Sequence, residues 1–156
     1  MEIKGDVDFL YNLNGSGWSQ CKLFLETAEI SIFNTHIFNN PIEELISAIN
    51  KILKGEENVS FIWHREPGGH SWKIVKDKKA DILNITIDKF SGDEIRNTET
   101  LVEFKIKVRQ FIILVYYQMK KIAELLKDKS YNSQGNRNED FPFAIFTEME
   151  KLVNDN

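Results

Sequence analysis

The sequence has a single cysteine and no long apolar run. Because Cys21 has no second cysteine to pair with, no disulfide can form within the chain, and a reducing compartment is the simpler expectation. The longest strongly apolar run, Phe111 to Tyr117, is far shorter than the roughly 20 residues of a membrane-spanning helix. Met1 to Asp6 shows no basic region followed by an apolar one, so no secretory signal is visible. We therefore expect a cytoplasmic protein that does not enter a membrane.

An excess of basic charge is also absent. The 20 Lys and Arg residues are outnumbered by 24 Asp and Glu residues, which gives a formal net charge of −4. Nucleic-acid binding needs clustered basic side chains, so we expect a protein partner with a basic surface instead. Acidic residues gather between Asp81 and Phe104 and could steer such a partner, or could simply solvate an exposed face. The acidic residues of this stretch are Asp81, Asp88, Asp93, Glu94, Glu99 and Glu103.

The common catalytic signatures are missing as well. The chain has no Gly-x-Ser-x-Gly nucleophile turn, no glycine loop that opens a helix for phosphate, and no His-Glu-x-x-His metal motif. The sequence therefore predicts no catalytic residue and no cofactor.

What the sequence does contain is enough for one globular domain over residues 1–156. Its 42% hydrophobic content can form a sizeable core. Alternating apolar and polar residues predict strands joined by short connections, which favours antiparallel pairing. The predicted strands lie near residues 9–13, 18–25, 30–32, 59–63, 72–75, 82–90 and 99–104.

Helix signals are clear at two places. Asn40 as N-cap, Pro41 at the first helical position and Glu43 three residues after the cap predict a helix that ends near Gly55. A long apolar series predicts the main helix near 105–127, and a last helix begins near Pro142, after a polar surface loop. The predicted fold class is α+β: an antiparallel sheet of about six or seven strands, packed on one face by two or three helices.

The stretch from Phe61 to Trp72 is the richest in chemically versatile side chains. If Glu66 to Gly69 form the turn, Trp63 lies opposite Trp72 and Arg65 opposite His70, all on one face. Two indoles flanked by a guanidinium and an imidazole can bind aromatic or carboxylate groups, although such a pair can also be simple core packing. The candidate binding residues are Trp63, Arg65, Glu66, His70 and Trp72.

Two alternative interpretations use residues of the same hairpin, and a third uses the long helix. Glu66 beside His64 or His70 could serve a small enzyme or ligand-binding domain that uses a Glu/His cleft. His64 and His70 fall on opposite predicted faces, so we expect no metal site, even with His36 available. A homodimer is a further alternative, with a seam formed by Ile113, Tyr116 and Tyr117 on the long helix.

Two motifs carry a resemblance. Asn40-Pro41-Ile42-Glu43-Glu44-Leu45 begins the first helix, and Trp63-His64-Arg65-Glu66-Pro67-Gly68 forms the following hairpin. Together they resemble a family of small, poorly characterised bacterial proteins. The size, acidity and lack of a catalytic set are similar to those of immunity proteins encoded beside polymorphic bacterial toxins. This resemblance implies a non-catalytic protein that neutralises a toxin by direct contact, and it implies no catalytic residue.

Overall fold

The computed structural model describes residues 2–92, 95 and 98–155. This part of the chain forms an α+β structure with seven antiparallel strands, as predicted from the sequence. The strands are β1 (Val7–Gly15), β2 (Trp18–Leu25), β3 (Ala28–Thr35), β4 (Asn58–His64), β5 (Gly69–Asp77), β6 (Ile82–Phe90) and β7 (Glu99–Lys107). The helices are α1 (Pro41–Leu53), α2 (Val108–Leu125), α3 (Lys129–Ser133), the 3-10 helix η1 (Arg137–Asp140) and α4 (Phe143–Asp155).

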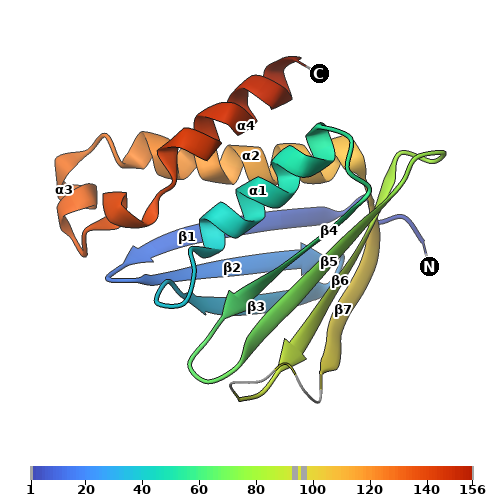
Figure 1. The fold of residues 1–156 in the computed structure, drawn as a ribbon, viewed down its shortest axis with the longest axis horizontal. Coiled ribbons are helices and arrows are strands. Elements are labelled where there is room, and N and C mark those ends of the chain that lie inside the picture. The colour runs from blue at the N-terminus through green and yellow to red at the C-terminus, as the bar shows by residue number, and fades with distance from the viewer. Residues whose placement is uncertain (1, 93–94, 96–97, 156) are drawn as a thin grey trace.

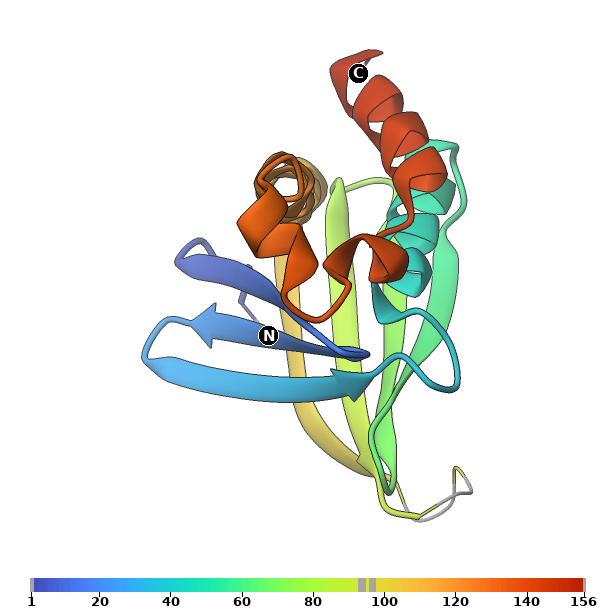
Figure 2. The same ribbon diagram turned by 90° about the vertical axis from the view of Figure 1, so that its left-hand side faces the viewer.

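The strands divide into two sheets and do not form one continuous sheet. The first has the order β1-β2-β3 and the second the order β4-β5-β6-β7, each a meander because its connections are short. The strands of the two sheets run in clearly different directions (Figure 2). Ile3 forms a parallel bridge with Lys105, and the Lys4 amide donates to the Lys105 carbonyl at 2.7 Å, so the N-terminal segment borders the second sheet.

Aromatic side chains join the two sheets and the helices into one core. Tyr11 of β1 contacts Trp63 of β4 with ring centroids 5.9 Å apart, and Phe9 of β1 contacts Phe111 of α2 at 6.4 Å. All four side chains are fully buried. The three strand residues lie at alternate positions that face inward, and Phe111 is a buried residue of α2. The core is therefore continuous from one sheet to the other.

The helices gather on one side of the sheets (Figure 1). α1 packs beside β4, α2 packs beside β1, and α4 contacts both helices. The Tyr116 ring of α2 stacks on Phe146 of α4 at 6.2 Å, and its hydroxyl donates to Glu150 at 2.7 Å. α4 thus covers a helix whose middle turns are apolar nearly all round. Tyr117 stays exposed, and the homodimer remains a prediction.

The long helix starts slightly later than the predicted bound near residue 105. β7 continues to Lys107, so α2 begins at Val108. Among the described residues, no helix combines the length and the apolar character of a membrane span.

The predicted surface loop before Pro142 contains two short helices. The Asp128 side chain caps α3 by accepting from the amides of Ser130 at 2.9 Å and Tyr131 at 3.0 Å. We name residues 128–140, which include α3 and η1, the strap. The Gly135 carbonyl accepts from the Ser16 amide at 2.7 Å, and this holds the strap against the turn between β1 and β2.

Candidate interaction surface

The β4–β5 hairpin forms as predicted but with a different register. Trp63 pairs with His70, and Phe61 with Trp72, whereas the sequence predicted Trp63 opposite Trp72. The turn begins one residue earlier, because the Arg65 amide donates to the Gly68 carbonyl at 2.8 Å. The expected pairing of Arg65 with His70 was therefore wrong. Since partners shifted by two positions keep their faces, Trp63, His70 and Trp72 still share one side of the sheet.

Gly69 explains why the turn closes where it does. A Cβ atom at Gly69 would overlap the carbonyl oxygen of Trp63 and the Phe90 ring. Only a residue without a side chain can therefore pair with His64 at this position. The glycine that the sequence assigned to the turn is in fact the first residue of β5.

The two tryptophans meet in the core. Their ring centroids lie 4.9 Å apart, and both side chains are fully buried. The Phe61 ring stacks on Trp72 at 5.5 Å, and the Trp63 indole donates to the Pro41 carbonyl at 2.9 Å. Trp63 and Trp72 therefore touch core side chains and the start of α1, and neither indole reaches the surface.

His70 is also a core residue. It is 4% exposed, and burial lowers its pKa to about 4, with smaller contributions from the positive charges of Lys89 and Arg65. Its imidazole is therefore neutral at pH 7. Its Nδ1 has no hydrogen-bond partner among the described residues. Its burial and its neutral imidazole suit a packed ring better than a group that binds a ligand, while the unpaired Nδ1 costs free energy.

Arg65 and Glu66 are the two candidates that remain exposed, in the loop at the end of the hairpin. His64 lies on the outer face of the sheet, where its ring contacts Phe38 with centroids 5.1 Å apart. A small cavity of about 140 Å³ next to this contact is lined by His64 and Arg65 but by neither Glu66 nor His70. This cavity therefore does not join Glu66 to His70, and His70 is itself buried.

An apolar surface that was not predicted from the sequence reaches this loop through Phe38, which lines the same small cavity as Arg65. Four large apolar side chains are exposed on β2, on β3 and on the loop that follows β3. Their exposed fractions are 40% for Trp18, 43% for Phe33, 69% for Ile37 and 59% for Phe38. We name these four residues the apolar end surface. The consecutive pair Ile37-Phe38 among polar neighbours was the only signal available in the sequence.

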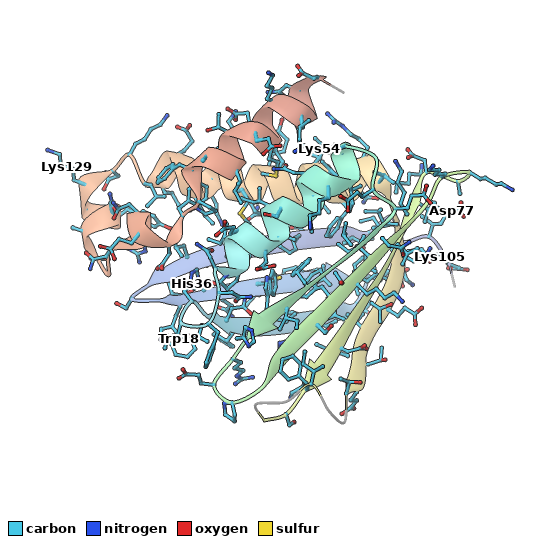
Figure 3. All side chains as sticks on the ribbon, in the orientation of Figure 1. Trp18, His36, Lys54, Asp77, Lys105 and Lys129 are labelled. Carbon is cyan, nitrogen blue, oxygen red and sulfur yellow. The ribbon has the colours of Figure 1, made fainter. Side chains whose placement is uncertain are left out.

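The apolar end surface is built from neighbouring elements. Trp18 pairs with Thr35 and Phe33 with Gln20 across β2 and β3, so the two aromatic residues are diagonal neighbours on one face. The His36 amide donates to the Gly17 carbonyl at 2.8 Å, which fixes the next residue, Ile37, beside the β1–β2 turn. Figure 3 shows Trp18 and His36 at the same end of the molecule.

A buried polar chain lies behind this surface. The Tyr11 hydroxyl and Ser19 Oγ lie 2.6 Å apart, Ser19 Oγ lies 2.9 Å from His36 Nε2, and His36 Nδ1 lies 3.5 Å from Asp140 Oδ1. Burial lowers the pKa of His36, while the nearby Asp140 carboxylate opposes that shift. We name these four residues the buried polar chain. The sequence could not reveal it, because η1 is far along the chain from β1 and β2.

The buried polar chain has the residue types of a serine hydrolase triad, but a substrate cannot reach its serine hydroxyl. An attacking hydroxyl must approach a substrate carbonyl closely, in the near-attack geometry of about 3 to 3.5 Å. Ser19 is fully buried and already held by Tyr11, whose own pKa is raised by burial. The arrangement therefore positions the strap relative to β2 and β3 and offers no reactive hydroxyl.

The acidic stretch lies mainly on the second sheet. The Asp88 carboxylate accepts from the Thr100 hydroxyl at 2.9 Å, and Glu99 pairs with Lys89 across the strands. Asp93 and Glu94 lie outside the described residues. Within residues 2–92, 95 and 98–155, no three His, Cys, Asp or Glu side chains are grouped to hold a metal ion.

Comparisons with known proteins identify no relative. No family model, no curated protein and no solved structure matches the chain.

Proposed function

We propose that this protein is a non-catalytic binding protein that captures a protein partner with the apolar end surface and the adjoining Arg65-Glu66 loop. It acts as an immunity-type protein, which neutralises a bacterial toxin by direct contact. The single observation that carries this proposal is the exposure of Ile37 and Phe38, side by side on one short loop. Contiguous exposed apolar side chains mark interaction sites on small proteins, and aromatic residues dominate binding energy there.

The loop that bears Ile37 and Phe38 is held from both sides. The Asn39 side chain donates to the Ile62 carbonyl of β4 at 2.9 Å. The Asn40 side chain caps α1 and donates to the Asp140 carbonyl of η1 at 2.8 Å. A loop fixed in this way loses little conformational entropy on binding, which favours affinity. Its exposed side chains are therefore pre-organised for a partner.

Charge supports a partner with basic groups around an apolar centre. The chain carries a formal net charge of −4, and opposite charge speeds the encounter between two proteins. Gly69 at the base of the hairpin pairs with Phe90 of β6. Asp88 of β6 therefore lies at the same end of the second sheet as Glu66 of the Arg65-Glu66 loop. Arg65 and Lys89 stand there too, so the rim has charges of both signs.

The test uses the protein encoded by the gene beside this one as the candidate partner. The two proteins are produced separately, and their dissociation constant is measured by calorimetry. We expect Ile37→Ser and Phe38→Ser each to raise the dissociation constant by at least about tenfold, as for central apolar contacts. Arg65→Ala combined with Glu66→Ala should weaken binding while changing the free energy of unfolding by less than about 0.5 kcal/mol.

Ile3→Ser is the matched control, because Ile3 is equally apolar and 51% exposed but lies beside Lys105. This control should bind like the unmodified protein. Failure of the neighbouring protein to bind, or equal affinity for the Phe38 variant and the Ile3 control, would reject the proposal.

A further inference from the structure

A second region of the molecule is built around two cations. A cavity of about 440 Å³ lies between β1, the C-terminal half of α2 and the strap. Its polar lining comes from Asn12, Asn14, Lys121, Tyr131 and Arg137. None of these residues belongs to the apolar end surface or to the buried polar chain.

Lys121 enters this cavity from α2 without an acidic partner. Its Nζ donates to the Tyr11 carbonyl at 2.8 Å, to Gln118 Oε1 at 2.9 Å and to Asn12 Oδ1 at 3.4 Å. All three acceptors are neutral. Burial lowers the pKa of Lys121, because the charged form is partly removed from water with no nearby carboxylate to compensate. The long contact to Asn12 is the weakest and the easiest to exchange for a ligand oxygen.

Arg137 enters the same cavity from the strap. Its Nε donates to the Leu13 carbonyl at 3.0 Å, and its Nη1 donates to the Tyr131 carbonyl. The guanidinium carbon lies 4.3 Å from the centroid of the Tyr131 ring, which keeps the side chain in place. Because a guanidinium has five N–H groups, these contacts leave donors at its terminal nitrogens. Among the described residues, neither Arg137 nor Lys121 forms an ion pair with a carboxylate.

The strand that anchors the two cations holds their acceptor carbonyls close together. Tyr11 and Leu13 are two positions apart on β1, so their carbonyls point to the same edge of the strand, about 6.6 Å apart. That edge faces away from β2 and is covered by side chains of α2, such as Gln118, whose Oε1 accepts from the Tyr11 amide at 3.2 Å. Two cations anchored on neighbouring carbonyls of one strand edge can each donate a charge-assisted hydrogen bond of about 2.8 Å to the same oxyanion.

We propose that the cavity between β1, α2 and the strap binds a small phosphate monoester through Lys121 and Arg137. Two half-buried positive charges without carboxylates are balanced best by a doubly negative group, and a phosphate monoester is close to doubly negative at pH 7. The cavity is also much larger than a phosphate group, so it has room for the remainder of a small molecule. The amides of Asn12 and Asn14 add neutral donors at the rim.

The competing explanation is that the two cations only cover the open edge of β1. Charged side chains do protect sheet edges from pairing with other chains. Under that explanation, the contacts to the Tyr11 and Leu13 carbonyls are the whole role of Lys121 and Arg137. Glutamine variants separate the two explanations, since a glutamine amide can still donate to those carbonyls but carries no charge.

The experiment titrates isotope-labelled protein with inorganic phosphate at constant ionic strength and follows the backbone amide signals by NMR. We expect saturable shifts at residues 11–14, 121–125 and 131–137. Lys121→Gln and Arg137→Gln should each raise the dissociation constant for phosphate by at least about tenfold. Acetate, which carries one charge, should bind more weakly than phosphate.

Lys129→Gln is the matched control, because Lys129 is an exposed strap residue whose side chain points outward (Figure 3). It removes the same charge and should leave phosphate affinity unchanged. The proposal is overturned if phosphate gives no saturable shifts in the unmodified protein, or if the shifts fall outside the cavity. It is equally overturned if folded Lys121→Gln binds phosphate as tightly as the control. The map of shifts in the unmodified protein decides the matter if a variant fails to fold.

Discussion

The indole nitrogen of Trp63 donates a hydrogen bond to the carbonyl of Pro41, the first residue of α1, at 2.9 Å. This bond joins β4, an edge strand of the second sheet, to the helix start that follows the loop with Ile37 and Phe38. The geometry of the proposed interaction surface therefore depends on a core tryptophan that cannot itself touch a partner.

Replacing Trp63 with phenylalanine should destabilise the fold. The change removes the bond to Pro41 and leaves a void beside Tyr11 and Trp72, so we expect a loss of about 2 to 4 kcal/mol in the free energy of unfolding. Urea-induced unfolding measures this loss. Trp18→Phe is the control, because Trp18 is exposed and should change stability by less than about 0.5 kcal/mol. Similar losses in both variants would contradict the assigned role of Trp63.

Asn40 has two separable roles. Its Oδ1 accepts from the amides of Ile42 at 3.0 Å and Glu43 at 3.2 Å, while its Nδ2 donates to the Asp140 carbonyl at 2.8 Å. Asn40→Ala removes both, and we expect it to cost about 1 to 2 kcal/mol of stability. Asn40→Asp keeps the cap but sets a carboxylate oxygen against the Asp140 carbonyl.

Hydrogen exchange distinguishes these two variants. In Asn40→Asp the amides of η1 should exchange faster while those of α1 keep their protection, because only the tether to the strap is lost. In Asn40→Ala both sets should exchange faster. Equal protection of η1 in Asn40→Asp and the unmodified protein would show that the tether contributes nothing.

His70 should make the fold sensitive to acid. Its pKa is about 4 in the folded protein and near 6.5 when unfolded, so the unfolded state takes up a proton first as the pH falls. Stability from this group is therefore complete above about pH 6.5 and is lost progressively down to about pH 4, by about 3 kcal/mol in total. Urea unfolding at a series of pH values measures this slope.

His70→Gln should flatten the slope, since glutamine does not titrate. His64→Gln is the matched control, because it changes a histidine of the same hairpin on the outer face. The control should keep the steep acid dependence. If the slope persists unchanged in His70→Gln, another group causes the acid dependence. His36 is then the first group to examine, since burial lowers the pKa of His36 as well.

The sequence predicted local structure better than it predicted the site. The Asn40-Pro41 helix start, the faces of β4 and β5 and the covered helix α2 all follow from signals within a few residues of one another. The register of the hairpin was missed because it depends on the closeness of Gly69 to the Trp63 carbonyl and the Phe90 ring, and Phe90 belongs to another strand.

The buried and exposed states of individual side chains were the hardest to predict. Trp63, His70 and Trp72 were candidates for a binding surface, with core packing as the alternative for the tryptophan pair. The structure buries all three, and Trp63 contacts Tyr11 and the start of α1. Ile37 carries the residue type of a core position yet is exposed, because the loop that bears it lies outside both sheets. Which apolar residue is covered is decided by contacts between distant segments, and a single sequence does not reveal those contacts.

The buried polar chain makes the last prediction, because its members should act as a unit. Ser19→Ala leaves the buried hydroxyl of Tyr11 and the imidazole of His36 without the partner between them, and we expect a loss of about 1 to 3 kcal/mol. Tyr11→Phe removes the hydroxyl at one end and should cost about 1 kcal/mol. Urea unfolding of both variants and of the double variant completes the cycle.

In the double variant the two losses should not add. Once Ser19 has lost its hydroxyl, removing the Tyr11 hydroxyl eliminates an unpaired buried group, so the double variant should be more stable than the sum of the single losses predicts, by at least about 0.5 kcal/mol. Additive losses would mean that the two hydroxyls, although 2.6 Å apart, contribute independently. They would also remove the reason for treating residues of β1, β2 and the strap as one connected support behind the apolar end surface.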